Sequence, residues 1–179
     1  MPSELVSRRY PRVPLWRRGA ALAVDFVAVA LVSSLFSMNA IAQMFLFVVA
    51  WLGMRVALVA RNQGQSLGRW AFDMKVVDLR WGGTPGLQEL AQREGLMAVG
   101  AGLMLFGLLN LSPASPWSLL LFIPLGIDCA LAGIDEEKRQ AFHDQLGRTL
   151  VVPTRRGYSL DLKLKWLWAL AERRLKQRQ

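Results

Sequence analysis

Four long apolar stretches constrain what this chain can fold into. They occupy residues 19–36, 41–60, 96–111 and 117–134, and each approaches the ~17–25 residues that a helix needs to cross a hydrocarbon core of about 30 Å. The third stretch is short and rich in glycine, which predicts close packing against another helix: Gly95, Gly100, Gly102 and Gly107. We therefore predict an all-α membrane protein with four transmembrane helices.

The positive charges give these predicted helices an orientation. Of the 22 Lys and Arg residues, five precede the first stretch, five lie between the second and third, and eleven follow the fourth. The two remaining loops, "SMNAIAQ" and "NLSPASP", carry no charge. Because Lys and Arg are retained on the cytoplasmic side of a membrane, both termini and the long middle segment are predicted to be cytoplasmic.

The same composition argues against several other classes of protein. A net charge of +9 and a pI near 10.8 are also typical of nucleic-acid binding, but each basic cluster lies beside a predicted span, so we expect no nucleic-acid partner. The single cysteine, Cys129, excludes a disulfide within one chain. No nucleophile with a nearby base and no set of metal ligands stands out, so we expect no enzyme activity, no cofactor and no metal.

Three ionisable residues fall inside the predicted spans: Asp25, Arg55 and Asp128. Counted from the nearest charged residue at the cytoplasmic end of each helix, with a rise of ~1.5 Å per residue, all three lie roughly 9–10 Å deep. A charge that faces lipid there costs at least ~2.5–3.5 kcal/mol. The three side chains are therefore predicted to turn inward and meet in one intramembrane polar site.

Two interpretations of this polar site remain open at this point. Two carboxylates and one guanidinium leave one negative charge, which could bind a cation or relay a proton. Alternatively, Arg55 neutralises a carboxylate and the pairing only fixes the helices. Pro124 and Gly126 could break the fourth helix just before Asp128 and expose backbone carbonyls there, although an ordinary kink is the commoner outcome.

The segments outside the spans predict a small cytoplasmic cap. In the middle segment, "AFDMKVV" alternates apolar and polar residues as a half-buried strand does. After the fourth span, His143 and Asp144 fall on a short helix that ends at Gly147, and "TLVV" is a second strand that could pair with the first. Ser66 and Arg69 are expected to cap a turn. The simplest role for Asp144 is to accept hydrogen bonds from Arg18 or Arg139 and lock the cap onto the helices.

Residues 154–179 form a basic tail with a different pattern. Apolar residues from Leu160 to Leu175 share one helical face, and Lys and Arg lie mainly on the other. Such an amphipathic helix is typical of the membrane surface, where tryptophans lie at headgroup depth and basic residues face anionic lipid. A helix that fills a groove on a protein partner has the same pattern.

Three stretches together resemble the RDD family of bacterial membrane proteins, named for an arginine and two aspartates. Arg18 and Asp25 stand seven residues apart, as the family's arginine and first aspartate do. "GQSLGRWAFDMKVVD" is similar to the family's Gly-x-Thr-x-Gly-Lys segment and Val-Val-Asp strand, with Ser66 and Arg69 replacing Thr and Lys. "RQAFHDQLGRTLVV" matches the family's last motif. The matching positions beyond the first pair are Gly64, Gly68, Arg139, His143, Asp144, Thr149, Val151 and Val152.

The resemblance implies an RDD-like membrane domain over residues 1–153, with Asp144 as the second aspartate of the motif. It also implies a bacterial inner membrane or an internal membrane as the location. Transport of cations, protons or small ligands has been proposed for the family, and we expect a transporter or a transporter component. The alternative is an adaptor or assembly factor that docks a partner through its basic cytoplasmic face. Four short spans cannot easily enclose a path, so a homo-oligomer or a membrane-protein partner is expected.

Overall fold

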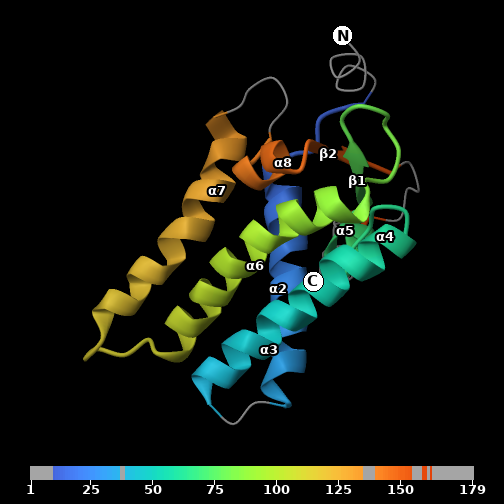
Figure 1. The fold of residues 1–179 in the computed structure, drawn as a ribbon. Helices are drawn as coiled ribbons and strands as arrows, with labels where there is room; N and C mark the ends of the chain where they lie inside the picture. Colours follow the sequence, from blue (N-terminus) through green and yellow to red (C-terminus); the bar gives the residue numbers. More distant parts are fainter. Residues whose placement is uncertain (1–9, 37–38, 135–139, 155–158, 161, 163–179) are drawn as a thin grey trace, which may run out of the picture.

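A computed structural model of the chain describes residues 10–36, 39–134, 140–154, 159–160 and 162. The described part is mostly helical, with one small antiparallel sheet (Figure 1). The long helices are α2 (Leu15–Ser34), α3 (Ala40–Leu52), α6 (Leu87–Leu109) and α7 (Ile123–Ile134). The shorter elements are the π-helix η1 (Gly53–Leu58), α4 (Val59–Arg61), α5 (Leu67–Ala71), the 3-10 helix η2 (Pro116–Phe122), α8 (Phe142–Leu146), β1 (Met74–Asp78) and β2 (Thr149–Pro153).

Two helical segments are long and apolar enough to cross a membrane. The first, Ala40–Arg61, runs continuously through α3, η1 and α4, and the second, Pro116–Ile134, runs through η2 and α7. Helices α2 and α6 are of similar length but carry more charge, with Arg17, Arg18 and Asp25 in α2. The positions of all four agree with the predicted stretches, although α6 begins nine residues earlier, at Leu87.

The junction between η2 and α7 lies before Pro124 rather than beside Asp128. The chain is a 3-10 helix up to Phe122 and α-helical from Ile123, so Pro124 sits in the first turn of α7, where the missing N–H of proline costs no helical hydrogen bond. Gly126 and Asp128 lie inside regular α-helix. A break near Asp128, which the sequence left open beside the commoner kink, is therefore not found, and the backbone there stays in regular helix.

Helix α6 packs centrally among the long helices (Figure 1), with α3 against it and η2 and α7 on another side. Phe47 and Trp51 of α3 form a buried core with Met97 and Leu105 of α6. The glycines of α6 allow this close approach. A Cβ at Gly102 would lie 3.0 Å from Val48, and a Cβ at Gly107 would come close to η2. A Cβ at Gly100 would make an ordinary contact with Leu125, and one at Gly95 would meet no atom within 4 Å.

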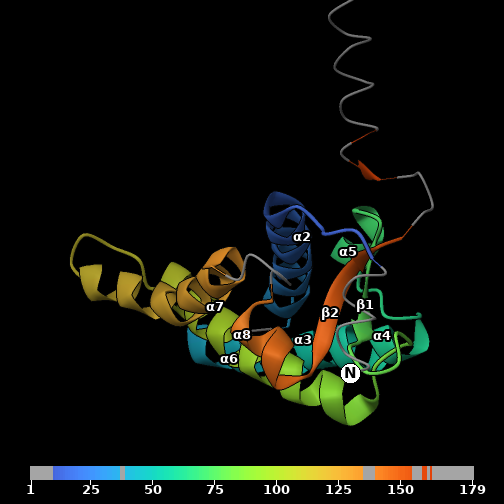
Figure 2. The same cartoon turned by 90° about the horizontal axis from the view of Figure 1, so that it is seen from above.

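The cap lies at one end of the helices (Figure 1). Strands β1 and β2 pair antiparallel with Val76 opposite Val151, as the alternating sequence predicted. Figure 2 shows α7 on one side of α2 and α5 with the two strands on the other. Ala21 of α2 joins Ala71, Met74 and Val76 of the cap in a second buried core, so the cap and α2 fold as one unit.

Helix α5 touches α2 through a glycine. A Cβ at Gly68 would lie 2.0 Å from the carbonyl oxygen of Ala21, which is backbone and cannot move aside. We therefore expect Gly68→Ala to push α5 off α2 and lower the free energy of unfolding by at least ~1–3 kcal/mol, the usual cost of overpacking. Gly126→Ala in α7 is the matched control, because a Cβ there meets nothing within 4 Å and alanine favours the helix. Equal stability of the two variants in detergent unfolding would contradict this packing.

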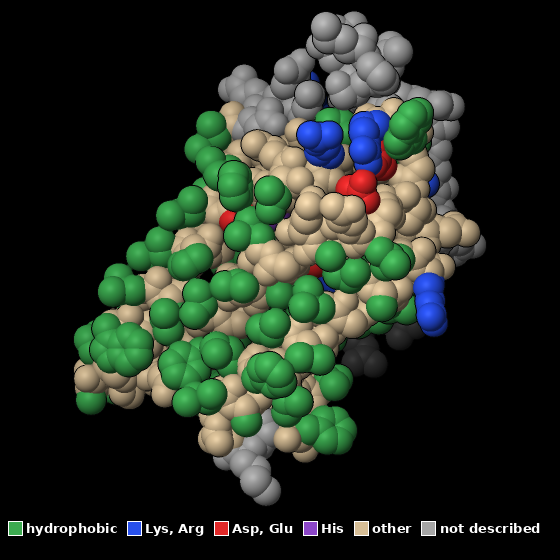
Figure 3. All heavy atoms as spheres, in the orientation of Figure 1, with side chains coloured by type: hydrophobic (Ala, Val, Ile, Leu, Met, Phe, Trp, Pro, Cys, Tyr) green, Lys and Arg blue, Asp and Glu red, His purple; other side chains and the backbone are tan. Residues whose placement is uncertain are grey.

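Charged and apolar side chains are separated on the surface. In Figure 3, hydrophobic side chains cover most of the lower part of the face shown, over α3, α6 and α7, whereas charged side chains gather mainly near the upper edge, over the cap. Large apolar residues are exposed along the long helices, among them Phe45 (67%), Val99 (58%) and Ile127 (58%). Exposed apolar surface of this extent on a helix is typical of contact with lipid or a partner. The predicted tail helix lies almost entirely outside the described residues.

Candidate polar site between the helices and the cap

Asp25 of α2 is completely buried and fully bonded. Its Oδ2 receives the Ser66 hydroxyl at 2.6 Å and the Arg55 guanidinium at 3.0 Å, while its Oδ1 receives the backbone N–H of Gly68 at 2.7 Å. Ser66 is the N-cap of α5, and its hydroxyl also accepts a bond from the Arg69 N–H, as the sequence predicted. Asp25 of α2 therefore accepts hydrogen bonds at the first turn of α5, where a carboxylate is stabilised.

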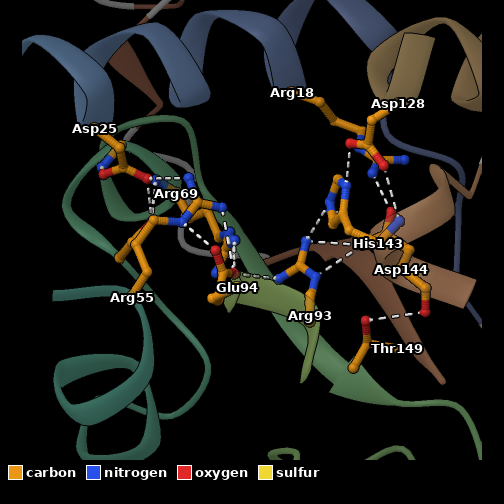
Figure 4. A network of polar contacts seen from close by, with 12 residues as sticks. Arg18, Asp25, Arg55, Arg69, Arg93, Glu94, Asp128, His143, Asp144 and Thr149 are labelled. Atoms are coloured by element: carbon orange, nitrogen blue, oxygen red, sulfur yellow. Dashed lines mark hydrogen bonds and ion pairs between the residues drawn. The ribbon is translucent and has the colours of Figure 1, made fainter. Parts of the chain in front are cut away.

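Arg55 lies in the π-helical segment η1 and links two acidic residues (Figure 4). Its Nη1 lies 3.0 Å from Asp25 and its Nε lies 2.8 Å from Glu94 of α6. The guanidinium also lies over the ring of Trp51, 4.7 Å from the ring centroid, which adds a cation–π contact. Short π-helical turns occur frequently at functional sites, and this one places a charge at the meeting point of three helices.

Glu94 is the centre of the network. Its carboxylate lies within 3.0 Å of Arg55, of the Nη2 of Arg69 (2.8 Å) and of the Nη1 of Arg93 (3.0 Å), and its side chain is fully buried. Burial alone would raise the pKa of Glu94, but the three guanidiniums outweigh it and hold that pKa below its usual range. Glu94 therefore stays ionised although it is buried.

Asp144 of α8 is the second acidic centre. Its carboxylate forms an ion pair with Arg18 of α2, and its Oδ1 lies 2.7 Å from the Nη2 of Arg93. Burial again favours the neutral form, but Arg18 and Arg93 hold the pKa of Asp144 below its ordinary value. Thr149 donates its hydroxyl to the Asp144 carbonyl at 3.4 Å. The expected lock between Arg18 and Asp144 is present, whereas Arg139 lies outside the described residues.

His143 and Asp128 form a pair next to this centre. Asp128 of α7 accepts the backbone N–H of His143 at 2.9 Å and contacts its ring Nδ1. The other ring nitrogen, Nε2, lies 3.2 Å from the Nη2 of Arg93 and 3.3 Å from the Oδ1 of Asp144. Since a guanidinium can only donate, this contact favours the neutral tautomer, with the proton on Nδ1 facing Asp128 and the lone pair on Nε2.

The network balances its own charge. Four guanidiniums face four carboxylates: Arg18, Arg55, Arg69 and Arg93 against Asp25, Glu94, Asp128 and Asp144. With His143 neutral, the sum is zero. The surplus negative charge inferred from Asp25, Arg55 and Asp128 alone is therefore not found among the described residues.

A cavity of about 260 Å³ opens beside the network. Helices α2, α6 and α7 and the cap line it, and His143, Asp25 and the four arginines of the network reach its wall. Among the described residues, no group of three or more His, Cys, Asp and Glu side chains lies close enough to hold a metal ion. The chemistry that the site offers is charge pairing, proton transfer at His143, and binding in the cavity.

The predicted site residues thus divide into two groups. Asp25 and Arg55 meet as predicted. Asp128 is on the same network but, among the described residues, contacts His143 instead of Arg55. Arg93 bridges the two groups by contacting Glu94 and Asp144. Position 64 requires glycine for the backbone alone, because its φ is +87° and a Cβ there would clash with the backbone of Val76.

Arg93 and Glu94 were missed by the prediction from the sequence. Hydropathy starts the third span after Gly95, so both residues were placed in the segment outside the spans and were not considered as site residues. The usable signal was the helical pattern from 87 onward, which continues without a break into the span. A continuous helix would have placed an adjacent Arg–Glu pair near the depth of Asp25.

The comparisons with known proteins give one family match. The model of the RDD family matches residues 12–148, which include the whole polar network and β1 and end one residue before β2. Neither the curated proteins nor the solved structures give a match to this sequence.

Proposed function

Since the chain belongs to the RDD family over residues 12–148, we propose that it is a four-span membrane protein that moves a small solute in a step linked to a proton on His143. The observation that carries this proposal is the place of His143, held between Asp128 and Arg93 at the wall of the cavity. Imidazole is the side chain whose charge most readily changes near neutral pH.

The membrane part of the proposal rests on four helices of suitable length. Two of them are apolar enough to span a bilayer. The other two, α2 and α6, carry charges that the network pairs and buries, so they too can lie in the membrane. The cap, with its charged surface (Figure 3), would then lie on the cytoplasmic side, in agreement with the distribution of Lys and Arg.

Fusions of a compartment-specific reporter test this orientation. A reporter at Gln179 should be active in the cytoplasm, and one at Asn39, in the loop between the first two helices, should be active on the opposite side. The physical reason is that the loop around Asn39 carries no positive charge. If both reporters are active in the same compartment, the four-span arrangement is wrong.

Protonation of His143 would disturb the balanced network. A proton on Nε2 removes the lone pair that faces Arg93 and brings two positive groups to 3.2 Å. The imidazolium would then favour the Oδ1 of Asp144, 3.3 Å away, and weaken the hold of Arg93 on Asp144. Since α8 contacts both α6 and α7, this exchange can change how α7 sits beside the cavity, which is what a proton-linked carrier needs.

One observation favours the adaptor instead. The network is charge-balanced and leaves none of the described carboxylates unpaired for a cation, so a purely structural role would explain its burial. An adaptor would also use the basic cytoplasmic face to dock a partner. It needs no movement of protons across the membrane, so a flux measurement separates the two functions.

Proton flux in proteoliposomes is the direct test. Vesicles loaded at acid pH with a pH-sensitive dye are diluted into Na⁺, K⁺ or lactate in turn. We expect at least one of these solutes to accelerate the pH change beyond that in protein-free vesicles. His143→Gln, which keeps hydrogen bonding but cannot titrate, should reduce that rate about tenfold or more, and Arg80→Gln, on the cap surface, should not. No flux above protein-free vesicles with any of the three would reject transport and leave the adaptor.

A further inference from the structure

The apolar lining of the cavity beside the network is not explained by the proton on His143. Besides the charged groups, most of its lining is apolar and comes from α2, α6, α7 and the strands, including Leu15, Ala21, Leu22, Met74, Met97 and Ala132. The cavity wall therefore combines apolar side chains with charged ones. A ligand that matches both has an apolar body and one charged group.

The charged side chains on the wall favour an anion, because four of those that line it are arginines and one is a carboxylate. Arg69 is buried, with 3% of its surface exposed, and lines the cavity. Its Nη2 binds Glu94, but its Nη1 has no hydrogen-bond partner among the described residues. A buried guanidinium nitrogen without a partner is costly, and a carboxylate is the group that best satisfies it.

The surroundings of Arg69 support the same sign of charge. Burial, and then the positive charges of Arg55 and Arg93, lower the pKa of Arg69 to about 9. The carboxylates of Glu94 and Asp25 act on Arg69 in the opposite direction. Asp25 is the carboxylate that lines the cavity, and its two oxygens are already bonded to Arg55, Ser66 and Gly68.

We propose that the cavity binds a small monocarboxylate with an apolar body, whose carboxylate is held by the arginine side chains that line the cavity, Arg69 among them. The volume of about 260 Å³ suits roughly ten non-hydrogen atoms, since a liquid water molecule takes ~30 Å³. Binding in the cavity requires no transport. Only the identification of this ligand as the transported solute rests on the proposed function.

Two glycines allow a matched test of the cavity. Gly19 lines the cavity and Gly126 does not, and a Cβ at either position meets nothing within 4 Å. Gly19→Leu should therefore add a side chain at the cavity wall without a clash at its Cβ, and Gly126→Leu should add the same side chain to α7 away from the cavity. Both replace glycine within a helix, so neither is expected to lose stability.

The measurement is titration of the purified full-length protein in micelles with octanoate. It is read by calorimetry and by protection of Cys129, the chain's one cysteine and a cavity residue, from alkylation. We expect saturable binding that weakens at least about tenfold, or ~1.4 kcal/mol, in Gly19→Leu and in Arg69→Gln but not in Gly126→Leu. Competition by benzoate, which we expect, would indicate that the ligand is a water-soluble carboxylate. Binding of octanoate without competition by benzoate would indicate a carboxylate that comes from lipid.

Three results would overturn the proposal. These are an absence of saturable octanoate binding to the wild-type protein, equal binding by the Gly19→Leu and Gly126→Leu variants, and equally tight binding of 1-octanol or inorganic phosphate. Because the titration is made without a membrane or a pH gradient, its outcome is separate from that of the flux measurement. Binding without flux supports the cavity site and rejects transport, and flux without binding does the reverse.

Discussion

Replacing Glu94 with glutamine is expected to destabilise the protein more than any other single conservative change in the network. The Glu94 carboxylate is shared by Arg55, Arg69 and Arg93. In Glu94→Gln, Arg55 keeps Asp25 and Arg93 keeps Asp144, but Arg69 loses the only carboxylate it contacts among the described residues. Removing one member of a buried ion pair costs ~3–5 kcal/mol, because the other is left uncompensated.

Glu89→Gln is the matched control, since it is the same substitution one and a half turns earlier in α6. Glu89 pairs with Arg80, which is 41% exposed, and an exposed pair contributes only ~0–1 kcal/mol. Reversible unfolding in mixed micelles should therefore separate the two variants by at least ~2 kcal/mol. If Glu94→Gln costs no more than Glu89→Gln, Glu94 is not the centre of the network.

The dependence of stability on pH should follow from the same groups. The pKa values of Glu94 and Asp144 are lower in the folded protein than their ordinary values of 4.5 and 3.8. Their stabilisation is therefore complete above those values and is lost as pH falls below them. Wild-type stability should lose little through these carboxylates between pH 7 and about 5.5 and decline below about pH 4.5, and Glu94→Gln should decline less.

Much of the fold could be predicted because the solvent imposes simple rules. Runs of apolar residues between uncharged and basic loops give the helices and their order. The alternation in "AFDMKVV" and the apolar stretch "TLVV" give the two strands that pair. The meeting of Asp25 with Arg55 followed from depth alone, since neither charge can face lipid at that level.

Depth could not predict the partner of Asp128. It fixes the level of a residue along the helix but not the direction in which the side chain points. Asp128 faces α8, which the chain brings back under α7, and so meets His143. Arg93 and Glu94 were missed for a related reason. Charged residues lower the hydropathy of a segment by the same amount whether they are buried in ion pairs or exposed, so hydropathy could not show that these two are buried.

The π-helical turn around Arg55 has no signature in the sequence either. The stretch "GMRVAL" contains nothing that distinguishes it from α-helix, yet the turn allows the guanidinium to reach both Asp25 and Glu94. The turn and the ion pairs of Arg55 occur together in the structure, and the stretch itself does not mark either of them.

The Asp25–Arg55 pair is the second position where a large effect is expected. Asp25→Asn and Arg55→Gln should each cost ~3–5 kcal/mol, because each leaves a buried charge without its partner. The double variant removes both charges at once, although Glu94 also loses a contact in it. Because Asp25 is fully bonded, its role is structural in this account, and proton flux should return in the double variant to the extent that stability does.

The coupling free energy between Asp25 and Arg55 tests most directly whether buried charges lock the cap onto the helices. It is obtained from the unfolding free energies of the wild type, both single variants and the double variant in mixed micelles. We expect the double change to cost less than the sum of the single changes by about 1–3 kcal/mol. The matched cycle of Asp25→Asn with Arg80→Gln should be additive within ~0.5 kcal/mol. Additivity in the Asp25–Arg55 cycle as well would contradict the account, since it would mean that the two charges do not hold each other.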